Sequence, residues 1–277
     1  MRAIWALCLR NLRNFMRDRL RLLITILTPF GFIYVLTSLF QTQLQGNPIG
    51  HVIAGVTIAT VFQTSLNIAA TTIEDIGSGF MKEILVSPIS RFQVAFGQML
   101  AGATIATMQG FLIFAIGMFT GLGFQKPHTL LLVFLSMFLV GLVYSALGLL
   151  VATLVRDAQT YQIVEQAVVL PLVFLSGAYV PVNLFPTFLV YLSFANPMTY
   201  TTMFFRAIVL ENNGTDAEMV KNGLAFSING FIFKPWMSGL VVFGCGILFL
   251  ILATVTFQRA DFTHTRKRKR KKMEVSE

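Results

Sequence analysis

Long runs of apolar residues constrain this chain more than any other feature of its sequence. The chain holds six such runs, at about residues 22–40, 51–73, 92–119, 130–154, 160–176 and 236–257. A hydrocarbon layer about 30 Å thick takes about 20 residues of helix per crossing. Charged residues make up only 12% of the chain, against about 25% in a soluble domain. The sequence therefore predicts an all-α integral membrane protein whose six transmembrane helices lie within 22–257, and it excludes a soluble globule.

Basic residues gather at both ends of the chain and in two of its connections. Of 21 Lys and Arg residues, six lie in 1–21, eight in 258–277, two (Lys82 and Arg91) between the second and third runs, and Arg156 after the fourth. Cytoplasmic loops are enriched in Lys and Arg, so this split of 17 to 4 predicts a multi-pass plasma-membrane protein with both termini in the cytoplasm. A basic tail beside a last span is typical of an anchor on anionic headgroups. We therefore expect membrane lipids, and no nucleic acid, as its partner.

The first 21 residues predict an amphipathic helix at the inner membrane surface. At 100° per residue, arginines fall on one stripe and apolar residues lie broadly opposite. The two stripes are Arg10, Arg13, Arg17 and Arg21, and Trp5, Leu9, Leu12, Met16 and Leu20. A solvated basic arm is the alternative, but an arm would not need apolar residues on one side.

Residues 177–235 predict a different kind of element on the outer side. The nine apolar residues 187–195 stand between Pro186 and Asn196-Pro197. Nine residues are too few to cross a bilayer, so they indicate a re-entrant or interfacial element before the last span. A polar loop follows at 211–234.

Small residues recur at four-residue spacing in the third run, at Gly102, Ala106 and Gly110. Such a face lets helix backbones approach closely in lipid. We expect it to pack within the subunit.

No residue pattern indicates catalysis or a bound cofactor. The three His and two Cys residues are scattered, and no glycine-lysine pair exists from which a GxxxxGK[ST] phosphate loop could be built. We expect a protein that is not an enzyme and holds no metal or cofactor. Any ATP-driven work must then be supplied by a partner.

The connection at 74–91 predicts a short stiff helix at the cytoplasmic surface. Glycines open it, an amphipathic turn follows at 80–86, and Ser87-Pro88 closes it with a bend. Phe80, Ile84 and Leu85 would be free to dock into another protein.

Two segments carry a resemblance to a known family. Glu74, Gly79 and the run 82–91 resemble the "E…G…L..l..sP.sr" loop of permease subunits of type-2 ATP-binding-cassette exporters, which export drugs, lipids or polysaccharides. Residues 175–181 through 196–200 resemble the "SG.f.P…nP.tY" pattern of the same family. The resemblance covers nearly the whole chain in element order. One departure is Ile76-Gly77-Ser78, where many relatives carry charge.

The resemblance implies a division of roles along the chain. Residues 1–21 would be the elbow helix, 74–91 the coupling loop and 177–235 the region of the outer re-entrant helices. It implies contact with a separate ATPase subunit, which would bind ATP and Mg, and a homodimer or heterodimer of permeases. The expected ATPase-coupling residues are Gly79, Phe80, Lys82, Glu83, Ile84, Leu85, Ser87, Pro88 and Arg91.

Polar residues inside the apolar runs are candidates for a translocation path. Gln63 and Asn67 share a helix face at i, i+4, and Gln162, Glu165 and Gln166 cluster in the fifth run. Glu165 would lie about 14 Å along its helix from Arg156, near the midplane, where a carboxylate costs about 2.5 kcal/mol or more. Glu165 would either line a path or form a structural hydrogen-bond cluster with Gln162 and Gln166.

The sequence thus favours the membrane-spanning permease of an ATP-driven exporter. Its cargo would be a hydrophobic or amphipathic compound, a lipid or a lipid-linked glycan. The alternative is an ATP-independent secondary transporter or channel, which broken helices at mid-membrane and inverted repeats would favour. The sequence shows its helix break near the outer face and no repeat.

Overall fold

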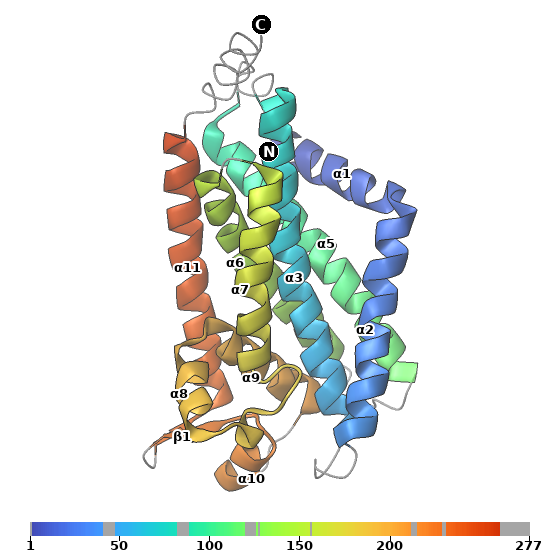
Figure 1. Cartoon of the computed structure of the whole chain (residues 1–277), viewed down its shortest axis with the longest axis vertical. Helices are drawn as coiled ribbons and strands as arrows, with labels where there is room; N and C mark the ends of the chain where they lie inside the picture. Colours follow the sequence, from blue (N-terminus) through green and yellow to red (C-terminus); the bar gives the residue numbers. More distant parts are fainter. Residues whose placement is uncertain are drawn as a thin grey trace, which may run out of the picture.

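The protein is a bundle of long helices with a cap of short elements at one end (Figure 1). The computed structural model describes residues 2–40, 48–81, 89–119, 126, 128–155, 157–211, 215–228 and 231–260. Its long helices are α1 (Arg2–Arg17), α2 (Arg19–Phe40), α3 (Pro48–Ser78), α5 (Arg91–Phe119), α6 (Thr129–Leu154), α7 (Ala158–Leu175) and α11 (Pro235–Arg259). Its short elements are a 3-10 turn (Val182–Leu184), α8 (Thr187–Ala195), α9 (Pro197–Leu210), α10 (Asp216–Lys221) and strands β1 (Phe226–Ile228) and β2 (Phe231–Phe233).

Five helices of the described residues are long and apolar enough to cross a membrane. They cover Leu22–Leu39, Ile49–Ser78, Arg91–Phe119, Thr129–Leu154 and Pro235–Arg259. These helices confirm the prediction of a helical, multi-pass membrane protein. The predicted fifth span is occupied by α7, a helix of 18 residues whose first half is rich in polar residues, so it falls outside this group.

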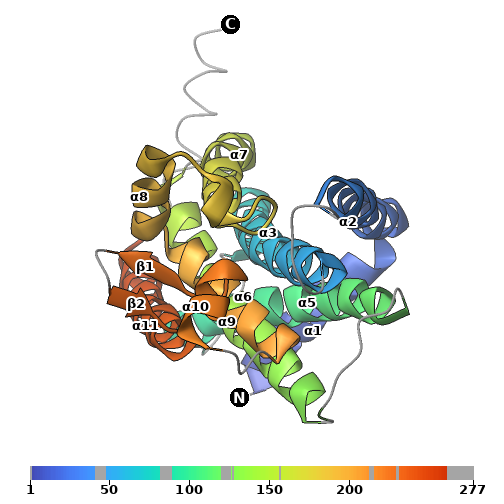
Figure 2. The same ribbon diagram turned by 90° about the horizontal axis from the view of Figure 1, so that it is seen from below.

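Helix α3 is the centre of the bundle. In the end-on view α2, α5, α6, α7 and α9 surround it (Figure 2). Its side chains Ile53, Ile58 and Phe62 are fully buried, and the rings of Phe62 and Tyr144 of α6 pack edge to face at a centroid distance of 4.5 Å. The helix that carries Gln63 and Asn67 is therefore also the helix against which most of the others pack.

Small residues let α5 lie very close to its neighbours. A Cβ atom added at Gly102 would lie 2.3 Å from the Ser145 hydroxyl, and one at Gly110 would lie 2.4 Å from a methyl of Val61. Ala106 between them is fully buried. The prediction that this face packs within the subunit is confirmed, and its cause is close backbone approach between helices.

The two ends of the bundle differ in their elements. At the α1 end lie α1, the last turns of α3 and the last turn of α11, whereas the α8 end carries α8, α9, α10 and the β1–β2 hairpin (Figure 1). The hairpin lies within 211–234, where the sequence analysis predicts only a polar loop. The sequence between its strands, Asn229-Gly230, is the strongest short hairpin signal.

Candidate functional site

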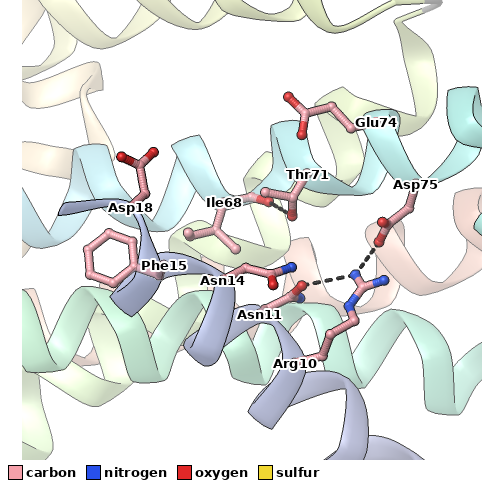
Figure 3. Close-up of a pocket in the computed structure, with 9 residues that line it drawn as sticks. All are labelled: Arg10, Asn11, Asn14, Phe15, Asp18, Ile68, Thr71, Glu74 and Asp75. Carbon is pink, nitrogen blue, oxygen red and sulfur yellow. Dashed lines mark hydrogen bonds and ion pairs between the residues drawn. The ribbon is translucent and has the colours of Figure 1, made fainter. Parts of the chain in front are cut away.

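A ring of four polar side chains joins three helices at the α1 end. Arg10 of α1 forms an ion pair with Asp75 of α3 and donates a hydrogen bond to the Asn11 amide oxygen at 2.9 Å (Figure 3). Asn11 donates to Gln98 of α5 at 2.6 Å, and Gln98 donates to Asp75 at 3.3 Å. The ring closes on itself, so each helix is held by side chains of the other two.

The ring is connected directly to the predicted coupling segment. The Arg10 guanidinium lies 4.3 Å from the centroid of the Phe80 ring, within the range of a cation–π contact. Gly79 ends α3 with a φ of 88°, a left-handed conformation that glycine adopts without steric cost. Two of the predicted coupling residues, Gly79 and Phe80, therefore lie where the chain leaves α3, and Phe80 contacts Arg10 of α1.

Met81 anchors the same segment to the bundle. Its side chain is fully buried and belongs to one apolar cluster with Leu7 of α1, Val94 of α5, Leu149 of α6 and Phe257 of α11. Met81 is not among the residues predicted from the sequence. Its apolar side chain beside Phe80 was the available signal, but periodicity does not show whether that side chain points into the bundle.

Arg91 holds two other elements together. Its Nη1 donates to the backbone oxygens of Gln258 at 2.7 Å and Ala260 at 2.9 Å. These carbonyls lie at the carboxyl end of α11, where the last turn lacks partners for its C=O groups. Arg91 thus joins the start of α5 to the end of α11. The remaining predicted coupling residues, Lys82, Glu83, Ile84, Leu85, Ser87 and Pro88, lie outside the described residues, as do Arg156 and the tail from 261 onward.

A cavity of about 220 Å³ lies beside the ring, between α1 and α3 (Figure 3). Its lining is Arg10, Asn11, Asn14, Phe15, Asp18, Ile68, Thr71, Glu74 and Asp75. The lining is mostly polar and the volume exceeds that of a single water. Water can therefore reach the ring that joins α1 to α3.

At the α8 end, side chains bind backbone atoms. Asn196 accepts a hydrogen bond from the Met198 amide at 2.9 Å and donates to the Leu172 carbonyl at 2.7 Å. One side chain thereby caps the start of α9 and the end of α7. The Tyr200 hydroxyl donates to the Phe194 carbonyl at 2.8 Å. The "nP.tY" pattern therefore has a structural role in fixing the turn between α8 and α9.

Arg206 of α9 supports the turn after α7. It is 4% exposed, and its Nη2 donates to the Gly177 carbonyl at 2.9 Å. Burial lowers the pKa of Arg206 to about 10, so the guanidinium stays protonated at neutral pH. Gly177 adopts a φ of 80° there. A Cβ atom at Gly55 of α3 would lie 1.9 Å from the Ala178 carbonyl oxygen, so the turn rests on bare helix backbone.

The polar residues at membrane depth divide into two groups. Gln63 and Asn67 are half-buried on one stripe of α3, and the Asn67 side-chain amide donates to the Gln63 carbonyl at 3.4 Å. Gln162 and Gln166 are exposed on α7, whereas Glu165 is buried at 7% exposure, beside an apolar cavity of only about 50 Å³. The three α7 residues that are close in sequence therefore meet different surroundings. Among the described residues, no three His, Cys, Asp or Glu side chains are placed to hold a metal.

One buried amide has a role that its position alone did not reveal. Gln109 of α5 donates to the Thr25 carbonyl of α2 at 3.2 Å and accepts from the Thr64 hydroxyl of α3 at 2.8 Å. The Thr25 carbonyl would ordinarily bind the amide four residues later, but that residue is Pro29, which has no N–H. Gln109 satisfies the freed carbonyl, as polar side chains of neighbouring helices do in membranes. The signal was Pro29 itself, which predicts an orphan acceptor at Thr25.

Comparison with known proteins decides the family. Residues 2–210 match the family described as ABC-2 type transporter. The chain belongs to the ABC-2 type transporter family. The match covers α1 to α9, so it includes the ring, the coupling segment and the α8–α9 turn.

Several curated relatives are transport permeases. The chain is 29% identical over 192 residues to the putative transport permease ycf38 of Cyanophora paradoxa, covering 67% of this chain and 66% of that one. It is 29% identical over 162 residues to the probable multidrug ABC transporter permease YbhR of Escherichia coli strain K12, covering 58% and 42% of the two chains. The same identity extends over 126 residues of the inner membrane transport permease YadH of that strain, 46% and 48% of the two chains. The chain thus spans less than two thirds of the length of these relatives, and it is a membrane transporter permease by family.

Proposed function

We propose that the protein is the membrane-spanning subunit of an ATP-driven exporter for a hydrophobic or amphipathic compound, a lipid or a lipid-linked glycan. A separate ATPase subunit supplies ATP hydrolysis and binds ATP and Mg. The family supports the assignment as a transporter. The name of YbhR, a probable multidrug ABC transporter permease, favours a hydrophobic or amphipathic compound as the cargo.

One observation carries the coupling role: the Arg10–Asp75–Gln98–Asn11 ring lies immediately before the coupling segment and contacts it through Phe80. A displacement of this segment by the ATPase would reach α1, α3 and α5 together, because the ring joins all three. Met81, buried against four helices, transmits the same displacement to α6 and α11. The ring is thus suited to convert a movement at the surface into a change in helix packing.

Replacing Leu85 by Asp tests the coupling role. We expect export to be lost and co-purification with the ATPase to fall at least tenfold, while the permease stays in the membrane, because the substitution places a charge in an apolar contact. Leu154→Asp, the same substitution at a leucine that is 71% exposed at the end of α6, serves as control. Normal export and normal co-purification of Leu85→Asp would refute the assignment.

The orientation follows from the charges. With 17 of 21 basic residues at the termini and two connections, the α1 end faces the cytoplasm and both termini lie there. In this arrangement α1 lies in the membrane interface, α7 is the fifth of six spans, and α8 and α9 form the outer re-entrant element. Labelling of Ser276→Cys in intact cells by an impermeant reagent would contradict it.

The polar residues of α3 and α7 mark the proposed path. Gln63, Asn67, Gln162 and Gln166 are half-buried or exposed on two adjacent helices, and amides at membrane depth avoid lipid when a protein or watery surface is available. A second permease copy facing these helices would enclose them. The path then runs between two subunits, with Glu165 buried behind it.

Substitutions of Glu165 distinguish a role that depends on its charge from a structural role. An amide keeps an acceptor and adds donors, so a hydrogen-bonding role survives Glu165→Gln, whereas a role of the charge does not. We expect Glu165→Gln and Glu165→Ala each to reduce export about tenfold at matched membrane abundance, equivalent to about 1.4 kcal/mol. Loss in the alanine variant alone would assign Glu165 to structure, and full activity in both would exclude either role.

A further inference from the structure

An apolar groove opens on the side of the bundle where α1 turns into α2. Its volume is about 420 Å³, within the range of about 300–1,000 Å³ that ligand sites occupy. Phe15 and Gln109 form its buried floor, at 7% and 2% exposure. Met16, Leu112 and Phe134 are 52%, 47% and 42% exposed along its length. The groove therefore begins at the α1–α2 elbow and opens toward the surroundings of the bundle.

The groove exists because α2 is attached to the bundle at few points. Only 11% of its apolar window is buried, against 61% for that of α5. The hydrogen bond from Gln109 to the Thr25 carbonyl holds α2 at one level. Because the polar groups of the floor are already paired with each other, the surface left to a ligand is hydrocarbon.

Arginines stand at the elbow end of this groove. Arg13 precedes Met16 by three residues on α1, and Arg19 precedes Leu22 by three residues on α2, so each lies about one helical turn from a groove residue. Both arginines are exposed. Within the described part of the chain neither forms an ion pair, since the pairs there join Arg10 to Asp75 and Lys234 to Asp216. An apolar channel with free cations at one end complements a molecule with a hydrocarbon tail and an anionic head.

We propose that the groove binds one anionic phospholipid from the leaflet at the α1 end. One acyl chain lies between α2 and α5, and the phosphate lies at Arg13 and Arg19. A groove of this kind that opens to lipid does not stay empty or fill with water, because an apolar cavity gives water no partners. The elbow cations select an anionic over a zwitterionic headgroup. The bound lipid fills the space between α2 and α5 and so supports the weakly attached helix.

Quenching of tryptophan fluorescence by brominated acyl chains tests the site. The full chain carries Trp5→Phe and Trp236→Phe, both at exposed positions, and a reporter, Phe134→Trp, in the groove. The control reporter, Phe243→Trp, lies on the exposed face of α11. Both are reconstituted into dioleoylphosphatidylcholine vesicles with brominated phosphatidylglycerol or brominated phosphatidylcholine.

We expect the groove reporter to prefer phosphatidylglycerol at least about fivefold, because a single arginine near an anionic lipid already provides that preference, and the control reporter to show none. Arg13→Gln with Arg19→Gln should bring the preference to about one, as should high salt, whereas Arg259→Gln at the end of α11 should not. Equal preference at both reporters, or a preference that persists in the double variant, would overturn the proposal. Absence of quenching in the groove would show that protein or another compound fills it. If Phe134→Trp does not fold, Leu112→Trp at the rim gives the same comparison.

Discussion

The polar ring at the α1 end and the turn after α7 at the α8 end are held together by different kinds of bond. In the ring, side chains bind side chains: Arg10, Asp75, Gln98 and Asn11 connect three helices. At the turn, side chains bind backbone carbonyls, as Arg206 binds Gly177 and Asn196 binds Leu172.

These two kinds of bond allow one bundle to combine helix movement with a fixed turn. Bonds between two side chains can be exchanged through rotamer changes or water, so helices joined by them can shift against each other. Bonds to backbone carbonyls in a turn hold the path of the chain itself. The ring at the α1 end is therefore suited to rearrangement, and the turn after α7 at the α8 end is suited to keeping its shape.

Gly55→Ala should give the largest effect on stability, because it acts on the turn after α7, whose backbone is held in place. The added Cβ would lie 1.9 Å from the Ala178 carbonyl oxygen and 3.1 Å from the Arg206 guanidinium, so the turn has to move away from α3. We expect the protein to lose about 2–3 kcal/mol of stability, as overpacked sites do, measured by thermal unfolding in detergent. Gly244→Ala is the control, since no heavy atom lies within 4 Å of its added Cβ. An unchanged melting temperature for Gly55→Ala would show that the α8 end yields easily.

Asp75→Asn tests the ring, and the neighbouring carboxylate provides the control. Asp75 is part-buried and pairs with Arg10 and Gln98, whereas Glu74 is exposed. After solvent screening we expect Asp75→Asn to cost about 1 kcal/mol and Glu74→Gln less than about 0.5 kcal/mol. Asp75→Asn should also weaken the stimulation of the ATPase by substrate. Equal effects of the two variants on unfolding would show that the ring does not stabilise the α1 end.

Asp157→Asn should give the smallest effect on stability. It tests whether the type of a bond or its position in the bundle determines how much that bond stabilises the protein. Asp157 belongs to the α1 end, yet it caps α7 by accepting from the Thr160 amide at 2.8 Å. That hydrogen bond, together with one from the Thr160 hydroxyl, lowers the pKa of Asp157. Its stabilisation is therefore present above the pKa of the unfolded chain, about 3.9, and is lost as the pH falls through the lower folded value. Asn caps helices nearly as well, so the variant should match the native protein at pH 7.

The measurement is the melting temperature between pH 7 and pH 3. The native protein should lose a small part of its stability on acidification that Asp157→Asn keeps. Parallel pH profiles of the two proteins would show that this cap contributes nothing.

Much of the fold could be predicted because its signals are local. Five of the six apolar runs correspond to the long apolar helices, since the length of a span is set by bilayer thickness. The small residues of α5 also predicted their own close packing. The hairpin after α10 was not predicted, because the polar residues of 211–234 indicate a loop, although Asn229-Gly230 between two short apolar runs is typical of a hairpin.

The site residues were harder to predict, because their partners are distant in sequence. Gln162, Glu165 and Gln166 are neighbours along α7, but only Glu165 is buried. Helix spacing places residues on a face, but it cannot say which face meets the rest of the bundle. The direction of each α7 side chain was decided by how α7 packs against α3 and α6.

Composition and short motifs are enough to predict that this chain spans a membrane, where its apolar runs begin and end, and which family it resembles. Those properties depend on signals that act over one or two helical turns. The contacts of Arg10 with Asp75, 65 residues away, and of Asn11 with Gln98, 87 residues away, depend on how the helices pack. The same packing places Gln109 at the carbonyl that Pro29 leaves free. No spacing rule connects such residues, because their contacts arise from helices that cross at angles set by packing across the whole bundle.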